Sequence, residues 1–389
     1  MAAMKKPSFN DAEPQAEGPG YQPRTLVLLG AGHAHVHVLS KLASAPLVST
    51  RVILVAPHPR QMYSGMVPGF VAGHYTLEDC VIPLEPLVRN ASVRWLQRSV
   101  KHLDAAQRLV TLDDGSTLHY DWLSVNTGPV QNRELIEQNI PGARTHGLFV
   151  RPIETFGALW PRVAEMGDAK PLRITVIGAG AAGIELALAV RHRLPTAAVT
   201  LMTGPSAPGA NYPAKAQERI ISALKSRKIT LLQESANGIS ESSVHFGTDS
   251  TLACDVPLLV TGAQPPVWLA DSGLALCAQG FLAVDEYQRS TSHPTVFAAG
   301  DVSTRMDRTL ARSGVYAVRA GPALANNLAA AAASGQPKAH QPPANTLNLL
   351  SCGERYAIGT WGNFCVQGRW VWALKNWIDR RFMSRYTVT

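Results

Sequence analysis

Cysteine is scarce in this chain of 389 residues, which has five, and none of them form a CxxC or CxxxxC pair. The absence of such pairs excludes a thioredoxin-like motif and a local redox dithiol. An odd number of cysteines spread over this length is also not typical of a secreted disulfide framework. The cysteine pattern therefore predicts a reduced, cytoplasmic protein.

Long apolar runs are also missing, since no run reaches the roughly 18 residues that a membrane-spanning helix needs. The alanine-rich stretch 323–333 comes nearest, but Asn326 and Asn327 interrupt it. Binding to a membrane surface is not excluded by this absence. At the N-terminus no apolar segment follows Lys5 and Lys6, so residues 1–23 are predicted to be a disordered tail and not a signal peptide.

Charged residues make up only 16% of the chain, and hydrophobic residues make up 46%, which is typical of a globular protein. The formal net charge of +8 is compatible with nucleic acid, an anionic membrane or anionic small molecules as partners. No nucleic-acid-binding motif accompanies the basic residues, so we expect no nucleic-acid partner.

Two segments read as a strand, a glycine-rich turn and a helix. In the first, Thr25–Leu29 leads into Gly30-Ala31-Gly32-His33-Ala34-His35, and in the second, Arg173–Ile177 leads into Gly178-Ala179-Gly180-Ala181-Ala182-Gly183. Each is followed by a helical pattern and a further strand, which is the βαβ unit of dinucleotide-binding folds. The sequence therefore predicts an α/β protein with two Rossmann-like domains.

Both turns place a helix N-terminus where a pyrophosphate can bind. The second turn is a complete GxGxxG, whereas His35 replaces the third glycine of the first. The acid that commonly binds a ribose hydroxyl after the second strand is absent from both units, which read Val55-Ala56-Pro57-His58 and Met202-Thr203-Gly204. The choice between NADH and NADPH therefore stays open.

Three further strands end in short motifs, which are Thr127-Gly128, Thr261-Gly262 and Gly300-Asp301. With the two glycine turns, their order resembles that of flavoproteins with two dinucleotide-binding domains, the pyridine nucleotide-disulfide oxidoreductase-like proteins. The resemblance covers residues 24–335 and is strongest to the branch of type II NADH dehydrogenases and sulfide:quinone oxidoreductases. The segments 30–39, 62–69, 313–322 and 368–383 resemble more closely still the oxidoreductase domain associated with selenophosphate synthetase.

This resemblance implies a discontinuous FAD domain over 24–145 and 285–335, an NAD(P) domain over 146–284 and a small α+β unit over 346–389. It implies electron transfer from NAD(P)H through FAD to a quinone-like acceptor, with Glu185 as the candidate catalytic residue. The residues that it places around FAD are Gly30, Gly32, His33, Ala34, Ser64, Gly65, Pro68, Val100, Thr127, Gly128, Gly300, Asp301, Ala317 and Val318. Those around the nicotinamide dinucleotide are Gly178, Gly180, Gly183 and Gly262.

Two other functions stay open. One is an FAD-dependent oxidoreductase of sulfur or selenium compounds with Cys352 or Cys365 as the reactive thiol, although the segment 126–131 lacks the cysteine of sulfide:quinone enzymes. The other is a non-catalytic flavoprotein that acts through a partner. His33, His35 and His37 have a spacing compatible with metal binding, but no further ligand is near them in the sequence, and we predict no metal site.

The C-terminal stretch 368–389 combines three tryptophans and five basic residues with a single acid, Asp379. On a helix, Trp370, Leu374 and Trp377 share a face, with Val371, Ile378 and Phe382 beside them, and Lys375, Asp379 and Arg380 are predicted to lie opposite. One interpretation is a helix at an anionic membrane surface, at the inner face of the cytoplasmic membrane. The other is a helix that docks on the protein's own core or on the second subunit of a homodimer.

Overall fold

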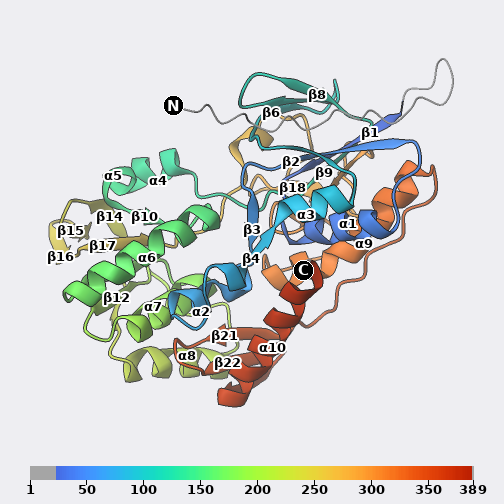
Figure 1. Cartoon of the computed structure of the whole chain (residues 1–389). Helices are drawn as coiled ribbons and strands as arrows, with labels where there is room; N and C mark the ends of the chain where they lie inside the picture. Colours follow the sequence, from blue (N-terminus) through green and yellow to red (C-terminus); the bar gives the residue numbers. More distant parts are fainter. Residues whose placement is uncertain (1–22, 388–389) are drawn as a thin grey trace, which may run out of the picture.

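The computed structural model describes residues 23–387, so the predicted N-terminal tail lies almost entirely outside the described residues. Its main feature is a pair of five-stranded parallel sheets (Figure 1), which confirms the predicted fold class. The first sheet has the order β19 (Val296–Ala298), β9 (Trp122–Val125), β1 (Arg24–Leu29), β2 (Thr50–Val55) and β5 (Arg94–Leu96). The second has the order β10 (Leu148–Phe149), β17 (Val256–Leu259), β11 (Arg173–Ile177), β12 (Ala198–Met202) and β13 (Thr230–Leu232).

The central strand of the first sheet is buried on both faces, which explains why β1 is a continuous apolar run. Leu26 and Leu28 pack with helices α1 (His33–Ser44) and α9 (Gly314–Ala332). Val27 and Leu29 point to the opposite face and pack against a small antiparallel sheet. That sheet consists of β6 (Val100–Asp104), β7 (Leu109–Leu112) and β8 (Thr117–His119).

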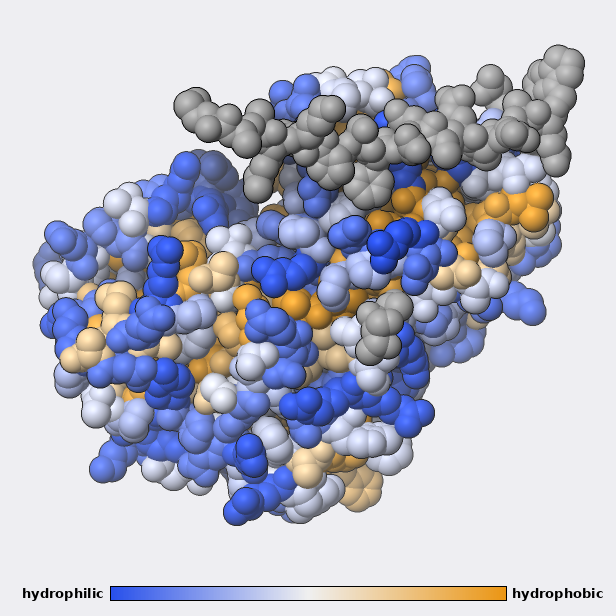
Figure 2. Space-filling view, in the orientation of Figure 1, coloured by the Kyte–Doolittle hydropathy of each residue, from blue (hydrophilic) through white to orange (hydrophobic). Residues whose placement is uncertain are grey.

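The second sheet repeats this construction. The part of the chain that forms this sheet also forms five helices and a small antiparallel sheet. The helices are α4 (Arg133–Asn139), α5 (Ala143–His146), α6 (Ile153–Ala169), α7 (Ala181–Arg193) and α8 (Ala214–Ser226), and the antiparallel strands are β14 (Ala236–Ile239), β15 (Ser243–Phe246) and β16 (Ser250–Ala253). Connecting segments contribute the pairs β3 (Arg60–Met62) with β4 (Val81–Pro83) and β18 (Leu282–Val284) with β20 (Ser303–Arg305), and the short helices α2 (Val67–Val71) and α3 (Leu84–Asn90). Figure 2 shows hydrophilic residues over most of one face of the molecule and an interrupted apolar band across its middle.

The C-terminal unit is a three-stranded antiparallel sheet followed by the long helix α10. Its elements are β21 (Asn348–Ser351), β22 (Ala357–Trp361), β23 (Phe364–Gly368) and α10 (Arg369–Tyr386). Helix α10 packs on this sheet and reaches α1 of the first domain (Figure 1). Among the described residues, no helix is both long enough and apolar enough to cross a membrane.

Helix α10 faces the protein with the side opposite Trp370 and Trp377, and this is the side on which the sequence predicts Lys375 and Asp379. They are 8% and 4% exposed and face the protein together with Val371 and Phe382. Their burial is tolerated because the Lys375 ammonium lies 2.7 Å from an Asp379 carboxylate oxygen and donates to the Gly65 carbonyl at 2.6 Å.

Candidate functional site

A cleft of about 560 Å³ opens at the carboxyl ends of the strands of the first sheet. This is the place where open α/β sheets bind ligands. Its walls come from both halves of the chain. Of the predicted FAD-binding residues, those that line it are Gly30, Gly32, His33, Ser64, Val100, Thr127, Gly128, Gly300, Asp301 and Ala317.

The first glycine turn leaves no space for a side chain at either of its two glycines. Gly30 has a φ of +83°, and a Cβ atom there would lie 2.5 Å from the Cα of Thr127. A Cβ atom on Gly32 would lie 2.5 Å from both the carbonyl and the side-chain oxygen of Asn126. The turn therefore requires glycine at both positions so that the backbone can lie flat against the end of β9.

Asn126, which no sequence motif singles out, joins the first glycine turn, the Thr127-Gly128 motif and the Gly300-Asp301 motif around the cleft. Its side-chain oxygen accepts hydrogen bonds from the backbone amides of Ala34 and His35 at 3.0 and 3.1 Å. Its amide nitrogen donates to the carbonyl of Ala299 at 2.5 Å, directly before the Gly300-Asp301 motif. The amide of Ala34 is thus already bound by the protein.

His35 occupies the position of the missing third glycine and is fully buried. Its two ring nitrogens lie 2.6 Å from the Gly30 carbonyl and 2.8 Å from the Ser124 hydroxyl. Burial lowers the pKa of His35 to about 4, so the ring is neutral. The side chain therefore crosslinks the turn to strand β9, and among the described residues no cluster of potential metal ligands includes it.

His33 supplies an observation that tests whether FAD fits this cleft. Its Nε2 atom is buried and has no hydrogen-bond partner in the described protein, although the residue lines the cleft. Burial, and secondarily the Arg151 guanidinium, lower the pKa of His33 to about 4. An unpartnered polar atom beside a side-chain-free turn at a helix N-terminus fits a pyrophosphate-containing ligand such as FAD.

Asp301 lies on the cleft wall near Arg151, which precedes helix α6. Burial raises the pKa of Asp301, while the guanidinium groups of Arg151 and Arg312 act in the opposite direction. Burial also lowers the pKa of Arg151. A partly buried carboxylate at the end of a strand is suited to accept a hydrogen bond from a ligand hydroxyl, as predicted for the ribityl chain.

We predict that Asp301→Ala lowers FAD affinity by about ten- to a hundred-fold, because a hydrogen bond to a charged group contributes roughly 1.5–3 kcal/mol. The measurement is FAD retention and Kd by flavin fluorescence. Asp121→Ala is a control, because Asp121 bonds the backbone amide of Thr25 and is absent from the cleft lining. Unchanged FAD affinity in Asp301→Ala would show that this carboxylate does not bind the cofactor.

The second glycine turn is tighter at its ends than in its middle. A Cβ atom on Gly178, which has a φ of +118°, would lie 2.5 Å from the Val260 carbonyl, and one on Gly183 would collide with the carbonyl of Gly178. Gly180 and Gly262 face open space. The turn and the amides of α7 are therefore accessible to a dinucleotide, while Thr203 follows β12 where an acid is commonly found.

Glu185, in the second turn of α7, is only partly exposed. Burial raises the pKa of Glu185 to about 7, and the opposing influences include the Lys375 ammonium and the hydrogen bond from the amide of Ser351 at 2.8 Å. A carboxyl group that titrates near neutral pH can exchange a proton with a reacting group or with water.

This raised pKa has a consequence for stability. Glu185 in the folded protein binds its proton more tightly than in the unfolded chain, where the pKa is about 4.3. Its contribution to stability is therefore greatest at low pH and is lost as the pH rises through about 7. We predict that raising the pH from 5 to 8 lowers the free energy of unfolding of the wild type by roughly 2–3 kcal/mol more than that of Glu185→Gln. This variant keeps an acceptor for the amide of Ser351. Urea unfolding at both pH values measures the difference, and equal pH dependence would contradict the raised pKa.

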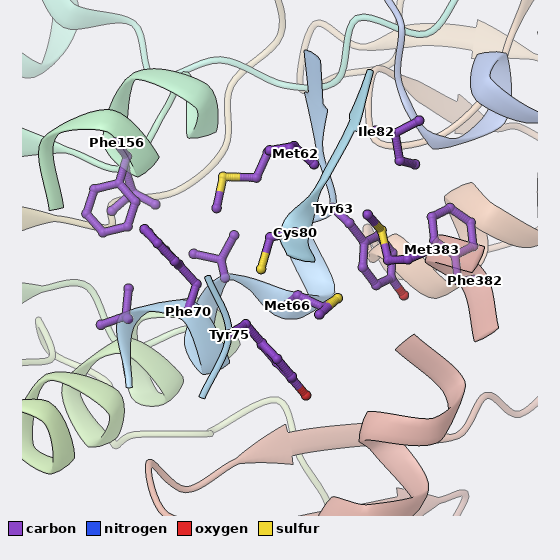
Figure 3. Packing of buried hydrophobic residues seen from close by; sticks show 14 of the residues in the cluster. Met62, Tyr63, Met66, Phe70, Tyr75, Cys80, Ile82, Phe156, Phe382 and Met383 are labelled. Carbon is purple, nitrogen blue, oxygen red and sulfur yellow. The ribbon is translucent and has the colours of Figure 1, made fainter. Parts of the chain in front are cut away.

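Helix α10 supports the wall of the cleft from behind. Tyr63 stacks on Phe382 with ring centroids 4.4 Å apart (Figure 3), and the ring centroid of His33 lies 5.3 Å from that of Tyr63. The Tyr63 hydroxyl donates to Asp379 at 3.2 Å, while Lys375 is bonded to Gly65, the neighbour of the cleft residue Ser64. The C-terminal unit therefore fixes the position of residues 63–65, a role that the sequence did not predict.

The other predicted site residues lie outside the cleft lining. Pro68 is buried in α2, Val318 is partly buried on α9, and the carbonyl of Gly65 is bonded to Lys375. Ala34, as noted, is bonded through its amide to Asn126. For these four residues a contact with FAD remains a prediction. The cleft-lining residues that the sequence did not point to include Arg151 and Asn126.

None of the five cysteines lines this cleft in the described part of the chain, and all five are free. Cys352 is fully buried, and burial raises its pKa to about 12. Cys365 is partly exposed on β23, where the guanidinium of Arg219 lies 3.5 Å from its sulfur. The arrangement gives no pair of thiols beside the flavin cleft.

Comparison with known families assigns the chain to one of them. Residues 24–327 match the model of the pyridine nucleotide-disulphide oxidoreductase family, so the chain belongs to this family. It is 25% identical over 335 residues to an alternative NAD(P)H-ubiquinone oxidoreductase C1 of Arabidopsis thaliana. The alignment includes 74% of this chain but only 62% of that relative's length.

Solved structures share the fold at low sequence identity. The structure of NDH2 from Plasmodium falciparum in complex with NADH has a TM-score of 0.76 at 12% identity, and the match covers 94% of this chain and 97% of that one. The sulfide:quinone oxidoreductase of Aquifex aeolicus also has a TM-score of 0.76, at 15% identity, covering 94% of this chain and 93% of the other. The family match confirms the predicted class of flavoprotein oxidoreductases with FAD and NAD(P)H, and the solved structures confirm its fold.

Proposed function

We propose that the protein transfers electrons from NAD(P)H through FAD to a quinone-like acceptor. The observation that carries the proposal is the link between helix α7, which follows the second glycine turn, and the cleft beside the first glycine turn. Glu185 lies on α7, where the Lys375 ammonium opposes the rise of its pKa that burial causes. The same ammonium donates to the carbonyl of Gly65, beside the flavin cleft. The residues that would hold the two cofactors therefore meet at one polar junction.

FAD, when bound, supplies the two-electron redox chemistry, and the chain supplies binding, orientation and charge. Gly30 and Gly32 would allow the pyrophosphate to approach the backbone, and Asp301 would bind the ribityl hydroxyls. Gly178, Gly180 and Gly183 would hold the nicotinamide dinucleotide, with Gly262 at the neighbouring strand end. Glu185 would hold or release a proton close to neutral pH, with Lys375 and Asp379 balancing the charge beside it.

A quinone-like acceptor is supported by the names of relatives, which include a ubiquinone oxidoreductase and the demethylphylloquinone reductase NdbB of Synechocystis. The absence of a cysteine from the cleft lining in residues 23–387 argues in the same direction, because electrons then leave the flavin directly. The raised pKa of the buried Cys352 argues against it as a reactive thiol. No observation favours the sulfur or selenium alternative, or the non-catalytic one, over this function.

An anaerobic reduction screen tests the proposal. Flavin bleaching by NADH or NADPH, followed by reoxidation with a soluble quinone analogue, is the expected result. The resemblance to the domain associated with selenophosphate synthetase makes selenide, together with sulfide, the appropriate alternative donor. Bleaching by selenide or sulfide alone, lost in Cys365→Ser, would favour the thiol mechanism, and no bleaching by any donor would favour a non-catalytic flavoprotein.

We propose further that the C-terminal unit places the protein on an anionic membrane surface. Five apolar side chains of β22, β23 and α10 are exposed, namely Trp361 (61%), Phe364 (81%), Val366 (40%), Trp370 (59%) and Trp377 (57%). Arg381 lies over the ring of Trp377 at 5.3 Å, which sets a cation beside an interfacial aromatic residue. Exposed tryptophans bordered by arginines suit the interface of an anionic bilayer.

We predict that a Phe364→Ser/Trp370→Ser/Trp377→Ser variant loses most of the binding of the wild type to anionic vesicles at low salt. Val48→Ser is the matched control, because Val48 is 87% exposed between α1 and β2, away from this unit. Co-sedimentation measures binding, and sedimentation velocity reports the oligomeric state. Wild-type protein that ignores anionic vesicles would contradict the proposal, and a dimer that the triple variant splits would assign the exposed side chains to a subunit interface.

A further inference from the structure

The flavin cleft extends to both sides of the central strand β1. At one edge of the first sheet, β19 leads into Gly300 and Asp301, and toward the other edge, β2 and β5 lead into residues 56–58 and 98–100. All of these residues line the cleft. Neighbouring strands lie about 4.8 Å apart, so the five strand ends together span roughly 19 Å. The cleft therefore has two separate ends, with the first glycine turn between them.

The end of the cleft beside β2 and β5 suits the adenosine half of FAD. With its pyrophosphate at the first glycine turn and its ribityl chain at Asp301, FAD would extend its adenosine half toward β2 and β5. The acid that commonly binds a ribose hydroxyl after the second strand is replaced there by Ala56-Pro57-His58. The guanidinium of Arg98 is already paired with Asp114 at 2.8 Å. The usual carboxylate contact to the ribose is therefore missing at this end.

A short 3₁₀ helix, η3 (Val267–Leu269), packs against β6 and adds a tryptophan to the wall of the cleft. Leu269 is buried, whereas Val267 is 65% exposed. Trp268, between them, is partly buried and packs on the same apolar cluster as Val100, the first residue of β6. Both Trp268 and Val100 line the cleft. The packing of η3 on β6 therefore brings Trp268 to the end of the cleft beside β2 and β5.

Among residues 23–387, Trp268 is the only phenylalanine, tyrosine or tryptophan that lines the cleft. Aromatic side chains bind nucleobases by stacking, which needs no particular pattern of hydrogen bonds because every base has a π-face. We propose that Trp268 stacks on the adenine of FAD and that this contact replaces the ribose-binding acid that is missing after β2. The inference rests on the binding of FAD, which the proposed function also requires, and is independent of the electron acceptor.

Two substitutions of Trp268 separate stacking from packing. Trp268→Phe keeps an aromatic ring, and Trp268→Leu keeps an apolar side chain without a ring. The full-length protein, freed of flavin, is titrated with FAD, and binding is followed by flavin fluorescence. We expect Trp268→Leu to bind FAD about five- to a hundred-fold more weakly than the wild type, which is the range for the loss of one base–aromatic contact. Trp268→Phe is expected to retain most of the wild-type affinity.

FMN and a second tryptophan serve as controls. FMN has no adenine, so Trp268→Leu is expected to bind FMN no more weakly than the wild type does. Trp361→Leu is expected to leave FAD affinity unchanged, because Trp361 is 61% exposed on β22 and does not line the cleft. Equal FAD affinities of Trp268→Phe and Trp268→Leu, or an equal loss of FMN and FAD binding in Trp268→Leu, would overturn the stacking role. Wild-type protein that binds no FAD would instead contradict the proposed function.

Discussion

Asp379→Ala is expected to destabilise the protein by about 3–5 kcal/mol, because it leaves the Lys375 ammonium buried without its carboxylate. The two side chains are 11% and 5% exposed and lie 2.7 Å apart, on a helix that packs against both the C-terminal sheet and the first domain. The variant also removes the acceptor of the Tyr63 hydroxyl, behind the flavin cleft. Urea unfolding of the FAD-loaded protein measures the loss.

Two further variants show whether the charge or the packing is responsible. In the double variant Lys375→Met/Asp379→Leu no buried charge is left unpaired, so most of the lost stability is expected to return. Ser384→Ala, at an exposed position of the same helix, is expected to change stability by no more than about 0.5 kcal/mol. A double variant as unstable as Asp379→Ala would contradict the ionic explanation.

Gly32→Val is expected to abolish FAD retention. Even a single Cβ atom at this position would lie 2.5 Å from two oxygen atoms of Asn126, and valine adds two further carbon atoms to this Cβ. The amide of Gly32 donates to the Asn126 carbonyl at 3.0 Å, so the backbone cannot move away without losing this bond. The combined effect is expected to reduce FAD affinity by more than about a hundred-fold.

Gly180→Ala is the matched control for this prediction. Gly180 has the equivalent place in the second turn, but a Cβ atom there meets open space. The variant is expected to keep its FAD, as measured from the absorbance ratio of flavin to protein. FAD retention in Gly32→Val equal to that in Gly180→Ala would contradict the placement of the pyrophosphate at the first turn.

Much of the fold was predictable because its signals are local. Strands β1 and β11 are short apolar runs beside glycine turns, and the predicted ranges Thr25–Leu29 and Arg173–Ile177 agree with them to within one residue. Parallel strands buried on both faces produce such runs irrespective of the rest of the chain.

The side chains that organise the site were less predictable. Asn126 acts through contacts with residues more than 90 positions earlier and 173 positions later, and no local pattern reports such distances. The burial of Lys375 and Asp379 on α10 was not predicted, because charged residues are rarely buried unless they are paired. Their pairing depends on Gly65 and Tyr63, which are more than 300 residues away in the sequence.

The most direct test of the central claim is an anaerobic titration of the purified, FAD-containing protein with NADH and NADPH, followed by absorbance. We predict that the protein is yellow, releases FAD on denaturation and loses its flavin absorbance with one equivalent of a reduced nicotinamide dinucleotide. We expect a quinone analogue to restore the absorbance. A protein that contains no FAD and cannot be reconstituted with it, or a bound flavin that neither dinucleotide reduces, would contradict the proposed function.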